Sequence, residues 1–387
     1  MTPPRWQLVD SDAAFRELVT RLSSEPLLAF DTEAASFHRF TDRVYLIQVS
    51  SRSETAVIDP LAVTDLAPVG ALLADPDIEV VFHDADFDLR SLDRDYGFRV
   101  RRVFDTRIAA QLLGEPGVGL GALLDKHFGL VLNKKFQRAD WSQRPLTPDM
   151  LAYAAADTAT LPQLRDVLRE ALASRSRLDW ATEEFQRLEG IRWSGPDNGE
   201  AYLRLKGARL LPPRGLAVLR AMYAWRDEQA RALDRATFRI MANEALVALA
   251  RLTPATPAQL KDVRELPPSI ADRYGRVLLE RIGAALATPE NSWPRFERRP
   301  GTRPDRDTEE RVERLKRFRN DRARELGIEP GVLCPNGTLE AIARTGGGPA
   351  ELDTIPELRA WQRVALGAAQ LAAALLESER RVEGGAG

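Results

Sequence analysis

The hydrophobic pattern divides the chain into an N-terminal part of alternating strands and helices and a C-terminal part that is helical throughout. Short runs rich in β-branched and aromatic residues predict strands at 27–33, 43–50, 55–60 and 78–84. Apolar residues at helical spacing predict helices at 66–75 and at 87–97, and the segment 102–114 predicts a short strand followed by another helix. This alternation is typical of an α/β layer fold with a mixed sheet, in which ligand sites lie at the carboxyl ends of strands.

The helical part contains an internal repeat. "WRDEQARALD" (225–234) matches "FRNDRARELG" (318–327), and "NEALVALAR" (243–251) matches "NGTLEAIAR" (336–344) at the same offset of 93 residues. Two copies of one small all-α domain are therefore predicted, joined by a proline-rich linker. The predicted boundaries are 1–200 for the α/β domain, 208–288 for the first copy, 289–307 for the linker, 308–380 for the second copy and 381–387 for a disordered tail.

The net charge of −2 conceals an uneven distribution along the chain. Residues 1–170 hold 19 basic against 26 acidic residues, whereas residues 204–299 hold 18 against 10. Residues 300–387 are nearly balanced at 14 against 15. An acidic domain beside a basic one suggests a cation-binding site joined to a module that binds polyanions.

Cysteine and histidine are too scarce for several classes of site. The chain has one cysteine, Cys334, and three histidines, so an internal disulfide is impossible and a Cys/His zinc site is nearly excluded. A metal here would have to be bound by oxygen. The start "MTPPRWQLVD" has no apolar signal region, and the longest apolar run is too short to span a bilayer. We expect a cytoplasmic, monomeric protein that does not contact membranes.

Carboxylates occur in three segments that the predicted fold can bring together. Asp31 and Glu33 end a buried strand on the same face, and Asp84, Asp86 and Asp88 lie where a strand passes into a helix. A third segment begins a helix with Thr147 as N-cap and Pro148 at the first position, which places Tyr153 and Asp157 on one face. Hard Mg²⁺ or Mn²⁺ ions prefer such oxygen ligands and would relieve the repulsion between the paired acids.

The three segments resemble the exonuclease motifs of the DEDD superfamily, tyrosine branch. The motif residues are "FDTE", His83 five residues before Asp88, and Tyr153 four residues before Asp157. "YLIQVS", "VFDTRIAAQLLG" and "DWSQRPL" further resemble the ribonuclease D family, and the two repeats resemble HRDC domains, which bind nucleic acids. The resemblance implies an α/β ribonuclease-H-like exonuclease domain with a mixed sheet flanked by helices, followed by two small all-α HRDC-like domains.

This resemblance also implies a reaction and a role for each motif residue. The family hydrolyses RNA from the 3′ end to nucleoside 5′-monophosphates with two divalent cations, and it matures tRNA precursors and other structured RNAs. Asp31, Glu33, Asp88 and Asp157 would hold the metals, and Tyr153 would orient the attacking water. The choice of Asp88 over Asp84 and Asp86 rests on the spacing from His83, which we interpret as a packed or supporting residue.

Residues outside the motifs are candidates for nucleic-acid contacts. Phe37 and His38 follow the paired acids and can stack on a nucleotide or pack within their loop. In the next candidate segment, Lys134, Lys135 and Arg138 surround Phe136, a pattern that suits a single strand, although a solvated loop fits equally. Arg226 and Arg231 of the first repeat are further candidates. Their counterparts Arg319 and Arg324 leave a structural role open.

The motifs together favour a metal-dependent 3′→5′ exoribonuclease. One alternative is an exonuclease that acts mainly on DNA, because sugar discrimination depends on contacts to the 2′-hydroxyl that a sequence does not reveal. Another is a catalytically silent nucleic-acid-binding adaptor, against which the complete set of acids and Tyr153 argues. Helicase activity is excluded because the sequence contains no G-x-x-x-x-G-K-[ST] phosphate loop.

Overall fold

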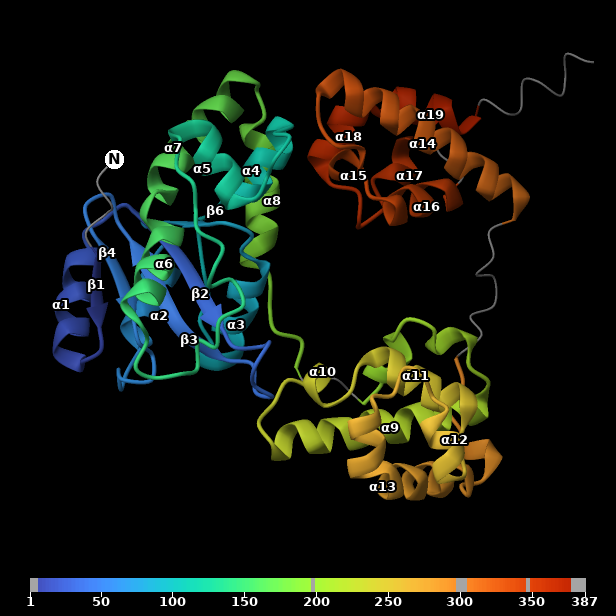
Figure 1. The fold of residues 1–387 in the computed structure, drawn as a ribbon. Helices are drawn as coiled ribbons and strands as arrows, with labels where there is room; N and C mark the ends of the chain where they lie inside the picture. The colour runs from blue at the N-terminus through green and yellow to red at the C-terminus, as the bar shows by residue number, and fades with distance from the viewer. Residues whose placement is uncertain (1–5, 196–198, 297–304, 346–348, 377–387) are drawn as a thin grey trace, which may run out of the picture.

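The computed structural model describes residues 6–195, 199–296, 305–345 and 349–376. The N-terminal domain holds a six-stranded mixed sheet with helices on both faces, and two helical domains follow it (Figure 1). The predicted tail and residues 297–304 of the predicted linker lie outside the described residues. The fold class predicted from the sequence is confirmed.

The elements of the N-terminal domain follow the alternation of the sequence. The strands are β1 (Trp6–Val9), β2 (Leu27–Ala34), β3 (Val44–Ser50), β4 (Thr55–Ile58), β5 (Glu79–Phe82) and β6 (Val103–Asp105). The helices are α1 (Asp12–Leu22), α2 (Ala67–Ala74), α3 (Asp86–Tyr96), α4 (Thr106–Leu113), α5 (Leu120–Phe128), α6 (Pro148–Ala159), α7 (Leu161–Ser174) and α8 (Leu178–Glu189). The elements β1, α1, α5, α7 and α8 have no counterpart in the prediction.

The sheet order is β1-β4-β3-β2-β5-β6. Strands β2, β3 and β4 form an antiparallel meander, and β1, β5 and β6 pair in parallel with their neighbours. Alternate residues of β2 face opposite layers, as a strand requires. Leu28 and Phe30 pack into the core with α1, α2 and α3, whereas Leu27 and Ala29 pack toward α4, α5 and α7. Asp31 and Glu33 continue this second face.

The C-terminal part forms the two helical domains that the repeat predicts. The first holds α9 (Pro213–Ala232), α10 (Thr237–Ile240), α11 (Asn243–Leu252), α12 (Pro257–Lys261) and α13 (Pro268–Leu286). The second holds α14 (Arg306–Leu326), α15 (Pro330–Leu333), α16 (Asn336–Arg344), α17 (Pro349–Leu352), α18 (Ala360–Leu366) and α19 (Ala368–Leu376). Tyr202 and Ala208 already belong to the core of the first domain, which therefore begins earlier than residue 208, its predicted start.

The identities between the repeats preserve an internal hydrogen-bond pair. Arg226 is 3% exposed and donates to the Met241 carbonyl at 3.1 Å and to Asn243 Oδ1 at 2.7 Å. At the equivalent places Arg319 donates to the Cys334 carbonyl at 2.9 Å and to Asn336 Oδ1 at 2.8 Å. The expectation that Arg226 contacts nucleic acid is therefore wrong, because its guanidinium is buried and ties α9 to the start of α11.

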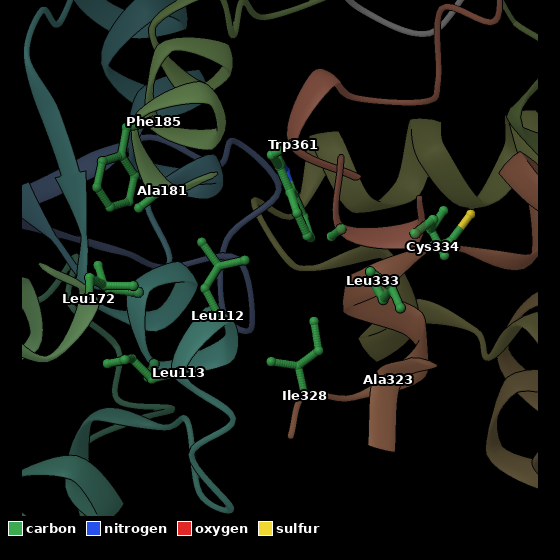
Figure 2. Packing of buried hydrophobic residues seen from close by; sticks show 14 of the residues in the cluster. Leu112, Leu113, Leu172, Ala181, Phe185, Ala323, Ile328, Leu333, Cys334 and Trp361 are labelled. Atoms are coloured by element: carbon green, nitrogen blue, oxygen red, sulfur yellow. The ribbon is translucent and has the colours of Figure 1, made fainter. Parts of the chain in front are cut away.

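The second helical domain shares its core with the N-terminal domain. Leu112 of α4 lies close to Ile328 and Trp361, and one hydrophobic cluster runs through both domains (Figure 2). Trp180 of α8 stacks on Trp361 with ring centroids 4.9 Å apart. The carboxylate of Glu183 accepts hydrogen bonds from the backbone N–H groups of Ala360 and Trp361, both at 2.8 Å, at the start of α18.

A glycine allows the close approach of these two domains. Gly114 ends α4 with a φ of +72°, and a Cβ at this position would lie 1.7 Å from the carbonyl oxygen of Gly327. Any side chain at residue 114 would therefore push the domains apart. Arg177 strengthens the same contact by donating to the carbonyls of Leu112 and Leu326.

Candidate active site

Three acidic residues converge where β2 meets α6. Ligand oxygens of Asp31, Glu33 and Asp157 all lie within 4.8 Å of one another. Asp31 and Glu33 point the same way from β2, and Asp157 reaches them from α6. Helix α6 begins as its sequence predicts, with the Thr147 hydroxyl accepting a hydrogen bond from the Met150 N–H at 3.3 Å and Pro148 in the first turn.

Asp88 stands beside this cluster at the first turn of α3. Its carboxylate Oδ1 accepts hydrogen bonds from the Thr32 backbone N–H at 3.0 Å and from the Thr32 hydroxyl at 2.5 Å. Thr32 lies between Asp31 and Glu33 on β2, so these bonds fix Asp88 next to the paired acids. Asp88 is 5% exposed, and its negative charge adds to burial and to the charges of Asp31 and Asp157 in raising the pKa of Glu33.

The two other acids of this segment are engaged elsewhere. Asp84 pairs with Arg107, and Asp86 forms an ion pair with Arg90 at 2.8 Å on the exposed face of α3. Among the three acids of this segment, Asp88 is the one that contacts β2 at Thr32, and its role as a metal ligand stays a prediction. His83 lines a pocket together with Asp31 and Asp157, and its Nδ1 lies 2.9 Å from the Thr106 hydroxyl. Burial lowers the pKa of His83 to about 4.

The acids of the cluster have raised pKa values, as expected for carboxylates that lie close together in a poorly solvated place. Burial raises the pKa of Asp31 well above its ordinary value, and the charge of Asp157 raises it further. Burial and the neighbouring carboxylates raise the pKa of Glu33 in the same way, and burial raises the pKa of Asp157 to about 7. Carboxylates held this close suit a divalent cation, whose charge offsets their repulsion and whose hardness favours oxygen ligands. The residues present therefore fit a divalent metal.

Tyr153 is held at the edge of the cluster by aromatic packing. Its ring lies 5.9 Å from the ring of Phe136 and 6.1 Å from that of the buried Trp141. The hydroxyl hydrogen-bonds to Asp157, and burial together with the nearby carboxylates raises the pKa of Tyr153. The phenol therefore stays protonated and can donate. Sequence reasoning used Trp141 only as part of a family motif and missed its packing role.

A pocket of about 400 Å³ opens over these groups. Its lining includes the acids Asp31 and Asp157, and also Tyr153, Lys134 and Gln137. Lys134 thus lines this pocket, and Lys135 lines a second pocket that Tyr153 and Asp157 also border. Lys135 lies over the Phe136 ring at 5.0 Å, and Arg138 lies over the Phe37 ring at 5.3 Å.

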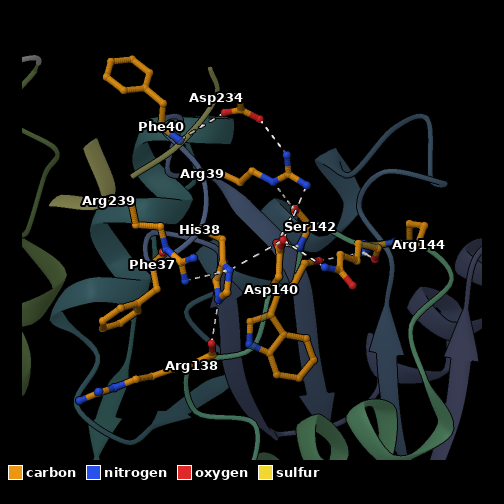
Figure 3. A network of polar contacts seen from close by, with 12 residues as sticks. Phe37, His38, Arg39, Phe40, Arg138, Asp140, Ser142, Arg144, Asp234 and Arg239 are labelled. Carbon is orange, nitrogen blue, oxygen red and sulfur yellow. Dashed lines mark hydrogen bonds and ion pairs between the residues drawn. The ribbon is translucent and has the colours of Figure 1, made fainter. Parts of the chain in front are cut away.

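The remaining predicted contacts lie where the first helical domain meets the N-terminal domain. Phe37 and His38 belong to the loop after β2, and His38 Nε2 is 2.9 Å from the Arg138 carbonyl (Figure 3). Arg231 is exposed and lies over the Phe40 ring at 5.2 Å, with Asp227 as its ion-pair partner. Unlike Arg226, it remains available to a ligand.

A neighbour of Asp31 escaped the sequence analysis. Gln48 of β3 stands directly opposite Asp31 in the antiparallel register and is fully buried. Neither polar atom of its side chain has a hydrogen-bond partner within the described residues. Because opposite residues of an antiparallel pair share a face, Gln48 borders the acidic cluster beneath α6.

Comparison with known proteins identifies the family of this chain. The family model described as a 3′-5′ exonuclease matches residues 6–173, and the HRDC domain model matches residues 215–282 and 308–373. A ribonuclease D of Pseudomonas paraeruginosa is 33% identical over 374 residues, which cover 96% of this chain and 98% of the relative. The chain belongs to the ribonuclease D family. The resemblance given by the sequence motifs is thereby confirmed, and the protein is a 3′→5′ exoribonuclease.

Solved structures agree with this assignment. The crystal structure of Escherichia coli RNase D, titled an exoribonuclease involved in structured RNA processing, superposes with a TM-score of 0.74 at 26% identity. The match covers 96% of this chain and 99% of that one. The catalytic core of RRP6 from Trypanosoma brucei matches 74% of this chain with a TM-score of 0.63 at 28% identity. No helix among the described residues is long and apolar enough to cross a membrane.

Proposed function

We propose that this ribonuclease D family member trims structured RNAs, such as tRNA precursors, from their 3′ ends with two divalent cations, Mg²⁺ or Mn²⁺. The observation that carries the proposal is the half-buried cluster of Asp31, Glu33 and Asp157 with Asp88 alongside. These carboxylates would hold the cations, which when bound supply positive charge to the reacting phosphate and make the attacking water more acidic.

The side chains around the cluster have distinct tasks in this proposal. Tyr153 keeps its proton and orients the attacking water, while its hydrogen bond to Asp157 fixes the direction of the hydroxyl. Trp141 and Phe136 keep the phenol ring in place. Lys134 lines the same pocket as the acids and would contact the phosphate of the terminal nucleotide. The pocket would hold that nucleotide while the bond before it is hydrolysed.

The substrate preference is proposed from the relatives and from the charge distribution. The Escherichia coli relative is described as acting in structured RNA processing. The excess of 18 basic over ten acidic residues in 204–299 gives the first helical domain the charge expected of an RNA-binding module. We propose that this domain attracts the body of a folded RNA while its single-stranded 3′ end enters the pocket. The protein would act as a monomer.

The test follows 5′-labelled RNA and DNA of one sequence, each with a single-stranded 3′ tail or a blunt end. The protein is freed of metal with EDTA and then given Mg²⁺ or Mn²⁺, and products are resolved by length. We expect tailed RNA to shorten one nucleotide at a time only after metal is restored. Full activity in EDTA would refute the metal mechanism, faster decay of DNA would favour the DNA enzyme, and binding without shortening would favour an adaptor.

A further inference from the structure

Two exposed phenylalanines from different domains meet beside the active-site pocket. Phe37 in the loop after β2 is 43% exposed, and Phe238 in α10 of the first helical domain is 51% exposed. Their ring centroids lie 6.1 Å apart at an interplanar angle of 74°. The guanidinium of Arg138 covers the Phe37 ring. Exposed aromatic side chains that lie side by side, rather than singly, form a surface that can contact a ligand.

The first helical domain holds the loop of Phe37 by its backbone. Arg239 Nε donates to the Phe37 carbonyl at 2.6 Å, and the Ala236 N–H donates to the His38 carbonyl at 3.3 Å. Asp234 accepts hydrogen bonds from the Phe40 N–H and from Arg39, both at 3.2 Å (Figure 3). The relative position of the two rings is therefore fixed before any ligand arrives, which reduces the entropy lost on binding.

A short stretch of chain connects this pair to the active site. Lys134 and Gln137 line the pocket that holds Asp31 and Tyr153, and Arg138 is the next residue along that segment. Phe37 itself follows Glu33 by four residues. A nucleic-acid strand whose last nucleotide occupies the pocket would thus find aromatic faces and an arginine directly outside it.

We propose that Phe37 and Phe238 form a two-domain stacking platform for bases of single-stranded RNA upstream of the 3′-terminal nucleotide. This inference rests on the proposed function. Every base has an apolar face that stacks on an aromatic ring, and Arg138 adds a positive charge for the phosphates and a planar group for the bases. The platform makes the first helical domain part of the substrate channel. It therefore contributes to binding only when the RNA extends beyond the terminal nucleotides.

The experiment combines ring variants with RNA that lacks single bases. Phe37→Ala and Phe238→Ala are compared with the unchanged full-length protein on an octanucleotide and on a dinucleotide. We expect KM for the octanucleotide to rise about ten-fold in each variant, in line with the usual effect of losing one stacked base. Hydrolysis of the dinucleotide should not change. An octanucleotide that is abasic at one upstream position should abolish the difference between variant and unchanged protein, because the base that stacks is already missing.

Further variants separate stacking from folding. Phe238→Tyr keeps an aromatic face and should retain the normal KM, whereas Phe238→Leu keeps the volume and should not. Leu252→Ala removes a side chain of matched exposure (52%) from α11 of the same domain and should have no effect. Equal KM values for Phe238→Leu and the unchanged protein, or the same loss at every abasic position, would overturn the platform. Failure of the unchanged protein on the dinucleotide would instead count against the proposed function.

Discussion

Asp88 differs from its acidic neighbours in the contacts of its carboxylate. Thr32 donates two hydrogen bonds to Asp88, whereas Asp84 and Asp86 are paired with arginines away from the cluster. We expect Asp88→Asn to lower turnover about 100-fold or more, because the lost charge would help hold a cation. The amide oxygen can still accept from Thr32, so the fold should persist. The measurement is kcat on a short RNA together with the melting temperature.

Asp86→Asn is the matched control for this substitution. It removes a carboxylate two residues earlier on the same helix, and its ion pair with Arg90 is solvent-exposed. Exposed pairs of this kind contribute little, so activity and melting temperature should stay close to those of the unchanged protein. An inactive Asp86→Asn beside an active Asp88→Asn would show that the wrong acid has been assigned to the site.

The raised pKa of Asp157 predicts a dependence of stability on pH in the metal-free protein. Its folded pKa of about 7 exceeds the ordinary 3.8, so its contribution to stability is fully present below about pH 4 and is lost as the pH rises through 7. Asp157→Asn cannot ionise. The difference in unfolding free energy between Asp157→Asn and the unchanged protein should therefore grow in favour of the variant by about 2 kcal/mol from pH 5 to pH 8. Denaturant unfolding in EDTA at both values measures this gain.

Two comparisons check the origin of that effect. Asp149→Asn, on the exposed start of the same helix, should show no such gain, because its carboxylate is 79% exposed. Addition of Mg²⁺ or Mn²⁺ should stabilise the unchanged protein more at pH 8 than at pH 5, since cations bind ionised carboxylates. Parallel pH dependence of Asp157→Asn and the unchanged protein would mean that burial does not raise the pKa of this acid.

At the scale of elements, the repeated arginine and asparagine hold each helical domain together. Arg226 links α9 to α11, and Arg319 links α14 to α16. Each arginine donates to a backbone carbonyl and to an asparagine side chain at equivalent positions of its own domain. We expect Arg226→Met to lower the unfolding free energy by about 2–3 kcal/mol, because the buried Met241 carbonyl and the Asn243 amide oxygen lose their donor. Arg319→Met should have a similar effect. Urea unfolding monitored by circular dichroism gives both values.

Arg231→Met tests the opposite expectation on the same helix. Its side chain is 73% exposed, and its ion pair with Asp227 spans 3.7 Å, so the loss in stability should stay below about 0.5 kcal/mol. The effect of Arg231→Met should be seen in RNA affinity and not in protein stability. Equal destabilisation by Arg226→Met and Arg231→Met would contradict the assignment of the first to the core and the second to the surface.

At the scale of the whole molecule, both helical domains contact the exonuclease domain but carry different charge. Residues 204–299 have a surplus of basic residues, whereas 300–387 do not. We expect replacement of four exposed arginines of the first domain by glutamine to weaken RNA binding and flatten its salt dependence. The replaced residues are Arg214, Arg220, Arg235 and Arg264. Each lost phosphate contact should reduce the slope of log K against log salt by roughly 0.7–0.9.

The second helical domain supplies the control. Its exposed arginines Arg306, Arg317, Arg324 and Arg344 can be replaced in the same way, and the salt slope should then change little. Affinities measured by fluorescence anisotropy over a salt series compare the two sets. Equal salt slopes for the two sets of variants would show that the surplus of basic residues in the first helical domain does not determine RNA binding. Truncation near residue 203 is a poorer test, because it would uncover Trp180 and Leu112, which the second domain covers.

The sequence by itself determined what depends on local spacing. The two-residue period of β2 places Asp31 with Glu33, the helical period of α6 places Tyr153 with Asp157, and the offset of 93 residues defines the repeat. The motif spacing also singled out Asp88. These features need only the geometry of one element, or a comparison of the chain with itself, so no knowledge of distant contacts is required.

Only the tertiary structure decided which residues far apart in the chain become neighbours. Arg226 and Arg231 look alike in sequence, yet one is buried and the other exposed, because the face of α9 that packs on α11 is set by the whole domain. Phe238 reaches Phe37 across two hundred residues, and Trp361 reaches Trp180 across nearly as many. Such contacts depend on how completed elements pack, and hydrophobic spacing within one element carries no record of its partner.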